Sequence, residues 1–375
     1  MRLLVLSASA GAGHTRAGEA LAQAARQLDA AAEVRHCDIL DLADSLYKKA
    51  YAGSYLQMVN RAPGLWGQFY KASDRPGDER RVREKLVRFF DRLEFARFRR
   101  FLTDFAPDAV IATHFLPCQV LAPYRRRGRF AFPLGVAVTD FDVHAFWVQP
   151  TADCFFAGSD EVAARLAGRG IDSGRVAVTG IPIAPDFARP RDRKQMRRRF
   201  GIAPKAFAVL MMGGGAGVGS LNEAVRAVLE IGRVHVLAVA GKNAPLKRTL
   251  EAMPVPRGSL LTALGFVDPI GDLMAASDLA VTKSGGLTTA ECLAMGLPMV
   301  VRDPIPGQEE RNCDFVLEAG AGVKAHGPHS LSFKVGRLLA DRARLSKMSE
   351  AARAAGRPEA AVAVVRAMLQ RANRA

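Results

Sequence analysis

Short apolar runs alternate with longer amphipathic stretches along most of this 375-residue chain. Runs typical of buried β-strands occupy residues 3–7 and 207–211, and each is followed, after a turn, by a stretch with helical spacing. Further strands are predicted at 33–38, 109–112, 133–139, 234–240, 260–264, 279–281 and 299–301. Strands that alternate with helices build parallel sheets from βαβ units, so the chain is predicted to be an α/β protein.

The pattern of strand, glycine-rich turn and helix occurs twice. The first turn reads Ser-Ala-Gly-Ala-Gly-His at residues 9–14, and a helix is predicted at 15–28. The second turn, residues 213–219, contains five glycines, and a helix is predicted at 221–231. Each copy opens its own doubly wound unit. We therefore predict an N-terminal domain at 1–187, a linker at 188–204, a C-terminal domain at 205–342 and two outer helices within 343–375.

The net charge is strongly positive. The chain carries 53 lysines and arginines against 37 acidic residues, a net charge of +16. The excess is concentrated at residues 61–130, 189–199 and 333–375. Such patches indicate an anionic partner, which the charge alone leaves open between a phosphate, a membrane surface and a nucleic acid. The run at 189–199 falls in the predicted linker and receives no role.

The composition excludes several classes of protein. A hydrophobic fraction of 49% with 34 glycines excludes a disordered chain. The five cysteines include no Cys-x-x-Cys pair, so neither a zinc site nor a disulfide framework is expected. No metal and no resident cofactor are predicted. No apolar stretch suits a membrane span, and the first residues are interpreted as a strand rather than a signal peptide.

Glycine-rich turns between a strand and a helix are typical of anion sites, because backbone N–H groups and the helix N-terminus face the ligand. The turn at 213–219 is predicted to bind phosphate. His14 directly follows the first turn, where a catalytic base and a merely capping or buried histidine are equally consistent with the sequence. Neither turn has the lysine and hydroxyl residue of a P-loop.

Two segments further along have the same chemistry. Residues 283–291 place two glycines and two threonines at a helix start, with Glu291 further into the helix, where it could accept hydrogen bonds from a ribose diol or simply be solvated. Residues 303–312 follow a strand and hold Gln308, Glu309 and Asn312, which suit sugar hydroxyls or a capped helix start.

Residues 138–144 also follow a strand and contain Asp140, Asp142 and His144, a set suited to acid–base chemistry or to plain solvation. Residues 46–71 hold four of the five tyrosines, one of the two tryptophans and several cations. That mixture suits a membrane interface, although an amphipathic helix on the domain's own core or stacking on single-stranded nucleic acid would also produce it.

These motifs resemble, in the same order, those of bacterial and plant diacylglycerol glycosyltransferases: the monogalactosyldiacylglycerol synthases and the processive diacylglycerol glucosyltransferases. The resemblance covers nearly the whole chain and is carried by residues 9–14, 138–150, 213–219, 265–267, 283–291 and 304–312. The N-acetylglucosaminyltransferase that makes the lipid-linked peptidoglycan precursor is a more distant relative. The sequence departs from the family's pattern at Ala10 and Ala12, where relatives often have glycine, and at Ser284, where they often have proline.

The resemblance implies a GT-B fold, in which two Rossmann-like doubly wound domains face each other across a cleft. It implies that His14 is the catalytic base, with Asp140 assisting or positioning it. For the donor diphosphate it implies Gly214, Gly215, Gly219, Ser284, Gly285, Gly286 and Thr288. For the uridine it implies Phe266, Val267 and Glu291, and for the donor hexose Gln308, Glu309 and Asn312.

The expected reaction is inverting transfer of galactose or glucose from a UDP-sugar to diacylglycerol or a glycosyldiacylglycerol. The expected location is cytoplasmic and peripheral on the inner face of the cell membrane, with no nucleic acid partner. Contact with the membrane and acceptor is assigned to Lys48, Lys49, Trp66, Tyr70 and Lys71. Alternatives are a GT-B transferase with another acceptor, a UDP-sugar epimerase and a basic nucleic-acid-binding protein. The donor hexose, the number of sugars added and the oligomeric state stay open.

Overall fold

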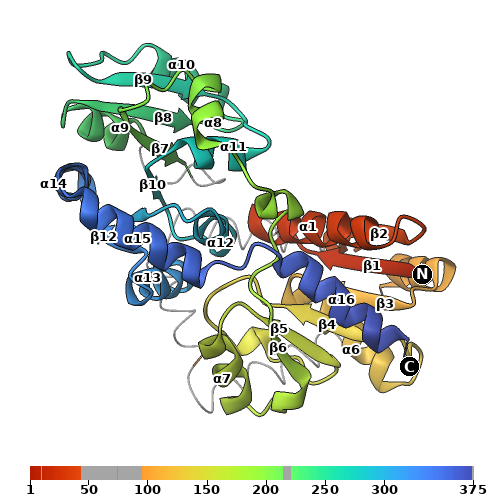
Figure 1. Cartoon of the computed structure of the whole chain (residues 1–375). Coiled ribbons are helices and arrows are strands. Elements are labelled where there is room, and N and C mark those ends of the chain that lie inside the picture. The colour runs from red at the N-terminus through yellow and green to blue at the C-terminus, as the bar shows by residue number, and fades with distance from the viewer. Residues whose placement is uncertain (10, 44–73, 75–94, 214–220, 374–375) are drawn as a thin grey trace. The chain divides into compact units, whose positions relative to one another are not determined.

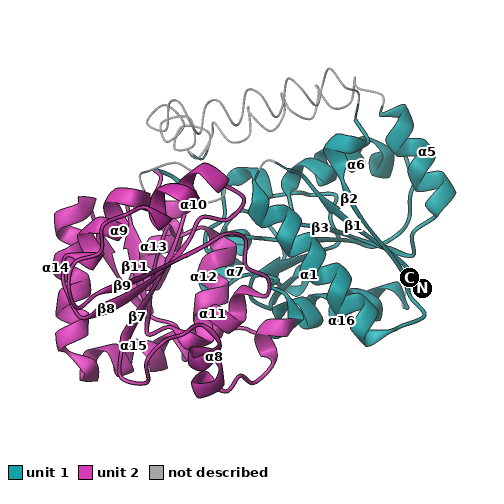
Figure 2. Ribbon diagram, turned by 90° about the horizontal axis from the view of Figure 1, so that it is seen from above, with its two compact units in different colours: residues 1–185, 306–308, 359–375 teal, residues 186–305, 309–358 magenta. Residues whose placement is uncertain are grey.

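The computed structural model describes residues 1–9, 11–43, 74, 95–213 and 221–373. They form two compact units (Figure 2). Unit 1 comprises residues 1–185, 306–308 and 359–375, and unit 2 comprises residues 186–305 and 309–358. Each unit is built on a parallel sheet of six strands, so the predicted α/β class is confirmed.

The sheet of unit 1 has the strand order β2-β1-β3-β4-β5-β6, and every neighbouring pair is parallel. Leu3 on β1 lies opposite Val34 on β2 and Ala109 on β3. The strands are β1 (Arg2–Ser7), β2 (Glu33–Asp38), β3 (Ala109–Ala112), β4 (Leu134–Ala137), β5 (Cys154–Ala157) and β6 (Val176–Val178).

Helices cover both faces of this sheet (Figure 2). Alternate strand residues such as Leu3 and Val5 pack on one face against α1 and α16, and Leu4 and Leu6 pack on the other face in a core that includes α5, α6 and α7. The helices are α1 (Ala12–Leu28), α5 (Ala96–Phe105), α6 (Phe115–Arg126), α7 (Asp160–Gly168) and α16 (Ala360–Ala372), with the short 3₁₀ turns Ile39–Asp41, Ala145–Trp147, Ser173–Arg175 and Pro185–Ala188.

The sheet of unit 2 has the order β12-β11-β10-β7-β8-β9 and is again parallel throughout. Its strands are β7 (Phe207–Met212), β8 (Val234–Val239), β9 (Leu260–Leu264), β10 (Leu279–Thr282), β11 (Met299–Arg302) and β12 (Gly322–Ala325). Its helices are α8 (Arg193–Arg199), α9 (Leu221–Leu229), α10 (Ala244–Glu251), α11 (Ile270–Ala276), α12 (Gly286–Ala294), α13 (Gln308–Glu318), α14 (Gly327–Ala340) and α15 (Arg342–Ala355). Residues from α9, α14 and α15 share one core with β7 and β8.

The two sheets share a topological feature that locates their sites. In unit 1 the chain moves outward from β1 to β2 in one direction and from β3 to β6 in the other. In unit 2 the same reversal falls between β7 and β10. Loops on opposite faces diverge at such a switch point and leave a crevice at the carboxyl ends of the two central strands, where open α/β sheets bind ligands.

The strands predicted at 33–38, 109–112 and 260–264 form over the predicted residues. The sequence pattern did not reveal β5, β6 and β12. These strands have only three or four residues each. Strand β6 and most of β12 are partly exposed and lack the apolar run that marks a central strand, whereas β5 is apolar and buried but very short.

The last two helices, α15 and α16, are separated by residues 356–359. Helix α15 belongs to unit 2 and packs against α12 and α14, whereas α16 belongs to unit 1 and lies beside α1 (Figure 1). Val364, Val365 and Met368 of α16 are completely buried and complete the core on that face of the first sheet. Gly356 lies between the two helices, where a side chain would clash with the backbone. An added β-carbon would come within 2.5 Å of the carbonyl oxygen of Leu293.

The basic run at 189–199 is an internal ion-pair network of unit 2. Arg191 and Arg199 both pair with Asp272 on α11, at 2.8 and 2.5 Å. Arg193 and Arg197 both pair with Asp278, just before β10, at 2.8 and 3.2 Å. Helix α8 therefore packs on α11 through its charges, and these four arginines are accounted for without any external anion.

Candidate active and donor-binding sites

His14 lies in the first turn of α1, at the carboxyl end of β1. The neighbouring strand β3 ends at Ala112 and is followed directly by Thr113 and His114. The next strand, β4, leads to Thr139. The three loops meet at the switch point of unit 1, so residues far apart in the sequence surround the His14 ring.

Two groups contact the Nδ1 atom of His14. The carbonyl oxygen of Thr113 lies 2.9 Å away, and the hydroxyl oxygen of Thr139 also lies 2.9 Å away. In return, the Thr113 hydroxyl donates to the carbonyl oxygen of His14 at 2.9 Å. A carbonyl oxygen can only accept, so Nδ1 carries the proton and Nε2 is the basic nitrogen. This tautomer is the one that a general base working through Nε2 requires.

Burial lowers the pKa of His14 from 6.5 to about 4, and the hydrogen bond to the Thr113 carbonyl opposes the shift. The ring lies edge-on to that of His114, with 4.6 Å between centroids, and 6.2 Å from the ring of Trp147. Burial, with a smaller contribution from His14, also lowers the pKa of His114. Both imidazoles are therefore neutral at neutral pH, and His14 is available to accept a proton.

The Nδ1 atom of His114 has a different hydrogen-bonding role from that of His14. It is the N-cap of α6, and its Nδ1 accepts a hydrogen bond from the backbone N–H of Leu116 at 3.0 Å. It is almost completely buried. These contacts make His114 a structural neighbour that shapes the pocket around His14. Sequence reasoning missed Thr113 and His114; their place directly after a fully buried strand was the available signal.

Asp140 follows Thr139 in the loop after β4 and is half-buried. The structure thus brings the Asp140 loop to His14 and places Thr139, one residue earlier, on Nδ1. Asp142, in the same loop, is buried and forms an ion pair with Arg165 of α7 at 2.9 Å. His144 caps the 3₁₀ turn Ala145–Trp147 by accepting from the Phe146 N–H. Asp142 and His144 therefore hold this loop in shape.

At the switch point of unit 2, β10 leads through Lys283 and Ser284 into α12, whose N-cap is Gly285. No side chain caps this helix, so its first N–H groups are available to an anion. Thr288, in the first turn, is half-buried. Glu291, one turn further, is 2% exposed.

The loop after β11 is joined to the start of α12. The Ser284 hydroxyl donates to the Glu309 carbonyl oxygen at 2.6 Å, and the Asn312 amide donates to the Ser284 carbonyl oxygen at 3.0 Å. The Glu309 carboxylate accepts from the Ile305 N–H at 2.8 Å. Burial raises the pKa of Glu309 and lowers that of Lys283, and the attraction between the two opposes both shifts. Asn312 is completely buried, so the structure gives it a positioning role between two loops.

Phe266 lies just beyond the end of β9 and is 67% exposed, although it is a large aromatic residue. The Lys242 ammonium group lies 5.6 Å from the centre of its ring. An exposed ring that follows a strand's carboxyl end can stack on a planar base. Val267 beside it is half-buried, and Gln308 is the first residue of α13.

Several predicted site residues lie outside the described residues. These are Gly214, Gly215 and Gly219 of the second glycine-rich turn, and the membrane-facing set Lys48, Lys49, Trp66, Tyr70 and Lys71. In the described parts of the chain, no group of three or more His, Cys, Asp and Glu side chains is arranged to hold a metal ion. No helix among the described residues has both the length and the apolar character that a membrane crossing needs.

Two family models match the chain, one in each half. Residues 14–183 match the monogalactosyldiacylglycerol (MGDG) synthase model. Residues 208–364 match the model of the glycosyltransferase family 28 C-terminal domain. His14 and the loop with Asp140 lie inside the first match, and the α12 and α13 loops lie inside the second.

Curated relatives match over almost their whole length. A processive diacylglycerol beta-glucosyltransferase of Bacillus subtilis (strain 168) is 28% identical over 353 residues, which are 93% of this chain and 90% of that protein. A protein of the same name from Bacillus cereus (strain AH187) is 27% identical over 369 residues, 98% of this chain and 93% of that protein.

Among solved structures, MurG of Acinetobacter baumannii has a TM-score of 0.64 at 16% identity, covering 98% of this chain and 99% of that one. The UDP-GlcNAc 2-epimerase of Neisseria meningitidis has a TM-score of 0.60 at 14% identity, covering 99% of this chain and all of that one. The spinosyn rhamnosyltransferase SpnG also matches, with a TM-score of 0.61 at 16% identity, covering 98% of this chain and all of that one. A transferase and an epimerase thus share this fold, so the fold alone does not separate the two activities.

Two parallel Rossmann-like units show the GT-B fold class, and the match of residues 208–364 to the glycosyltransferase family 28 model makes the chain a glycosyltransferase of that class. Within that class, the chain is similar in both halves to the diacylglycerol glycosyltransferases: residues 14–183 match the MGDG synthase model, and the processive diacylglycerol beta-glucosyltransferase of Bacillus subtilis aligns with 93% of the chain. The predicted family, fold and enzyme class are confirmed by these matches.

Proposed function

We propose that this chain transfers a hexose, glucose or galactose, from a UDP-sugar to the hydroxyl of diacylglycerol or a glycosyldiacylglycerol, with inversion at the anomeric carbon. The observation that carries the proposal is His14: a neutral imidazole with Nδ1 protonated, at the switch point of the unit that matches the MGDG synthase model. The relatives are named for a β-glucosyl product, which a single displacement on an α-linked UDP-glucose would give.

Unit 2 supplies the donor site. The free N–H groups at the start of α12, with Ser284, Gly285, Gly286 and Thr288, receive the diphosphate together with the glycines at 214–219. Glu291 accepts hydrogen bonds from the ribose hydroxyls, and Phe266 and Val267 border the uracil. Gln308 and Glu309 face the hexose. Asn312 contributes by holding the Ser284 carbonyl and thereby the loop geometry.

His14 acts on the acceptor. As the acceptor oxygen attacks the anomeric carbon, its proton passes to Nε2 of His14, and the bond between that carbon and the diphosphate oxygen breaks. The imidazolium that forms keeps its Nδ1–H bonded to the Thr113 carbonyl, which stabilises the positive charge. The developing charge on the departing UDP is stabilised by the N-terminus of α12. Asp140 positions the loop beside His14.

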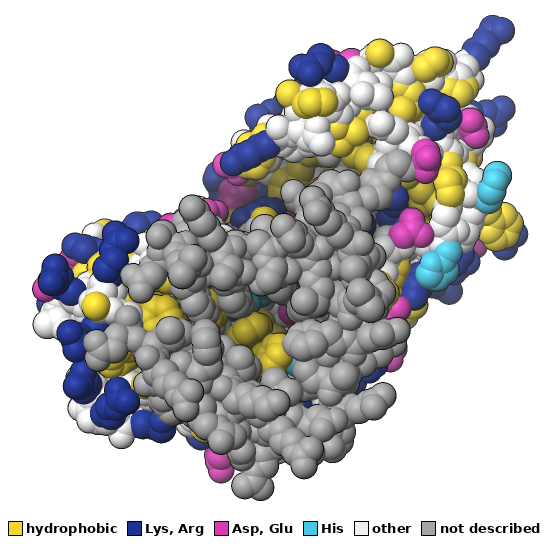
Figure 3. Space-filling view, turned by 180° about the vertical axis from the view of Figure 1, so that it is seen from behind, with side chains coloured by type: hydrophobic (Ala, Val, Ile, Leu, Met, Phe, Trp, Pro, Cys, Tyr) yellow, Lys and Arg dark blue, Asp and Glu magenta, His cyan; other side chains and the backbone are white. Residues whose placement is uncertain are grey.

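The acceptor is a membrane lipid, so we place the enzyme on the inner face of the cell membrane as a peripheral protein. The aromatic and cationic residues at 46–71 and the cations at 61–130 form the contact surface. On the face shown in Figure 3, the described Lys and Arg side chains lie in several separate groups among hydrophobic and neutral atoms. A cation near an anionic surface contributes about 1 kcal/mol, so attachment through several such weak contacts is reversible.

A donor and acceptor screen tests the proposal. The purified chain is incubated with UDP-glucose, UDP-galactose or UDP-N-acetylglucosamine, each with diacylglycerol in mixed micelles, and the lipids are separated by chromatography. We expect a glycolipid from one of the first two donors, and a series of larger products if transfer repeats. Transfer from UDP-N-acetylglucosamine to a peptidoglycan precursor, or UDP release without any lipid acceptor, would contradict the proposal and favour a different transferase or an epimerase.

A further inference from the structure

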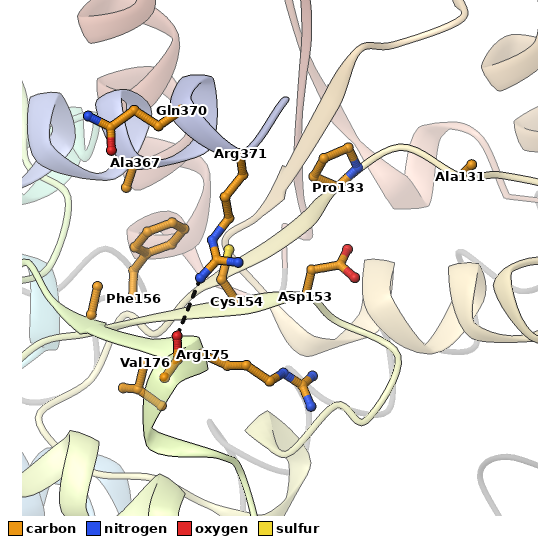
Figure 4. A pocket seen from close by; sticks show the side chains of 12 residues that line it. Ala131, Pro133, Asp153, Cys154, Phe156, Arg175, Val176, Ala367, Gln370 and Arg371 are labelled. Carbon is orange, nitrogen blue, oxygen red and sulfur yellow. Dashed lines mark hydrogen bonds between the residues drawn. The ribbon is translucent and has the colours of Figure 1, made fainter. Parts of the chain in front are cut away.

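Unit 1 contains a cavity of about 470 Å³ at the end of its sheet opposite to His14. Its walls come from the starts of β5 and β6, from the segment before β4 and from the last turns of α16 (Figure 4). The carboxyl ends of the strands, where His14 lies, are at the other edge. The cavity therefore takes no part in the proposed transfer, and its size is that of a small-molecule site.

Two guanidinium groups at this cavity have no carboxylate partner among the described residues. Arg371 reaches from α16 into the cavity beside Cys154 (Figure 4), and its one hydrogen bond, to the Gly174 carbonyl, is long at 3.5 Å. Arg175 bonds the backbone carbonyls of Ala152 and Pro150, and its buried Nε has no partner. Neither positive charge is neutralised.

The only acidic residue in the described lining is already paired. Asp153 forms an ion pair with Arg125 at 2.7 Å and accepts from the Leu134 N–H at 2.7 Å. The Arg125 guanidinium group also donates hydrogen bonds to the carbonyl oxygens of Thr151 and Phe132. The pair is neutral as a whole, so the cavity retains two positive charges, from Arg175 and Arg371.

Most of the remaining lining is apolar, with Gln370 as a further polar residue. Pro133, Phe156, Val176 and Ala367 line the cavity together with the two arginines. Guanidinium groups prefer phosphate and carboxylate oxygens, and two cations match a phosphate monoester, which is close to doubly charged at neutral pH. We propose that this cavity is a binding site for a phosphate monoester that carries a short apolar group.

Calorimetric titration of the whole chain with hexyl phosphate tests the site. The titration is run in excess UDP, so that phosphate binding at the donor site does not contribute. We expect saturable binding, no binding of hexanol and weaker binding of inorganic phosphate. Arg371→Gln should weaken binding by at least about ten-fold, because a charge-assisted hydrogen bond is lost.

Arg366→Gln is the matched control, because Arg366 is exposed on the same helix and does not line the cavity. It should bind like the wild type. Ala367→Leu fills the apolar part without altering charge and should also abolish binding, which keeps the test valid if the Arg371 variant folds poorly. Three results would overturn the proposal. They are no saturable binding by the wild type, loss of binding in Arg366→Gln, and unchanged binding in both Arg371→Gln and Ala367→Leu.

Vesicles distinguish the source of the phosphate. Competition of hexyl phosphate by phosphatidic acid vesicles, and not by neutral phosphatidylcholine vesicles, supports the site with a lipid headgroup as its ligand. Absence of competition, with hexyl phosphate still bound, supports the site with a soluble ligand. Equal competition by both vesicles would overturn the charge-based recognition.

Discussion

At the residue scale, the chemistry of this protein depends on the surroundings of one imidazole. His14 has its Nδ1 proton fixed by the Thr113 carbonyl, and burial keeps the ring neutral. Thr139 adds a second oxygen at 2.9 Å, from a loop 125 residues away in the sequence. The histidine is thus held in one tautomer and one protonation state before any substrate binds.

Replacing His14 with alanine should lower kcat by about 10²- to 10⁴-fold, the usual contribution of a general base. The affinity for UDP should stay unchanged, because the donor site belongs to the other unit. Steady-state kinetics and calorimetry with UDP measure the two quantities separately. His329→Ala, at an exposed position on α14, should behave as the wild type. Near-normal turnover in His14→Ala would show that another group is the base.

Acid should destabilise unit 1 through the same histidine. Its pKa is 6.5 when unfolded and about 4 when folded. Between these values the unfolded chain binds a proton that the folded chain does not, so stability falls as pH falls from 6.5 towards 4. His14 alone should cost about 2 kcal/mol at pH 5 relative to pH 7.5, and His114 adds a loss in the same direction.

Urea unfolding at pH 7.5 and pH 5 measures this loss. His14→Gln should lose less stability between the two pH values, by about the amount assigned to His14, whereas His329→Gln should match the wild type. An identical pH dependence in His14→Gln and the wild type would mean that the pKa of His14 is close to its ordinary value.

At the element scale, short segments that begin at switch points carry the donor chemistry. Helix α12 begins with Gly286 and has Thr288 in its first turn, and its N-cap, Gly285, makes no side-chain capping hydrogen bond. The α13 loop is held to it by Ser284 and Asn312. The two loops form one polar wall, which explains why a completely buried asparagine occurs here.

Glu291→Ala should weaken UDP binding by about ten-fold or more, because a carboxylate that accepts from two ribose hydroxyls is lost. Calorimetry measures the Kd. The matched control is Glu318→Ala, at the exposed end of α13. Unchanged affinity in Glu291→Ala, with the protein folded, would remove Glu291 from the ribose site.

Helix α8 is an element whose packing depends on charge. Asp278 pairs with Arg193 and Arg197, and it also accepts from the Ala208 N–H at 2.8 Å. Arg197 is 6% exposed, so removing its partner leaves a buried positive charge. Asp278→Asn should therefore destabilise unit 2 by about 3 kcal/mol, as measured by chemical denaturation. The control is Asp314→Asn, which removes an exposed ion pair of 4.0 Å with Arg311 and should lower the free energy of unfolding by well under 1 kcal/mol. Equal losses of stability in both variants would disprove the buried pairing.

At the scale of the whole molecule, the net charge of +16 divides into internal and external parts. Most arginines of the run at 189–199 form ion pairs with Asp186, Asp272 and Asp278. In the C-terminal excess, Arg342 approaches Asp278 at 3.7 Å, whereas Arg344, Lys347 and Arg366 are exposed. The cations at 46–130 are those proposed for the membrane surface.

Binding to anionic vesicles should be salt-sensitive and should weaken when Lys48, Lys49 and Lys71 are replaced together by glutamine. Each cation contributes about 1 kcal/mol near an anionic surface, so the triple variant should bind roughly 100-fold more weakly. Vesicle sedimentation at low and high salt measures the effect. The control replaces the exposed Lys194, Lys205 and Lys347. Equal binding of the wild type to neutral vesicles at high salt would contradict an electrostatic attachment.

The sequence by itself determined the α/β class, the two openings by strand, glycine turn and helix, and most of the central strands. It did so because apolar alternation and glycine turns are local signals, fixed by the backbone geometry of neighbouring residues. The family motifs added His14, Glu291 and the α12 start as site residues. The sequence pattern did not reveal β6 and β12, which are short and partly exposed, or β5, which is buried but only four residues long.

Only the tertiary structure decided which distant residues meet. Thr113 and Thr139 reach His14 from 99 and 125 residues away, because the order of the strands places β1 next to β3 and β3 next to β4. Arg191 and Arg197, in and just before α8, meet Asp272 and Asp278, each 81 residues later, for the same kind of reason. The return of α16 to unit 1 creates the cavity at Arg371. Strand order and helix docking follow from the packing of the whole core, and no local pattern of residues encodes them.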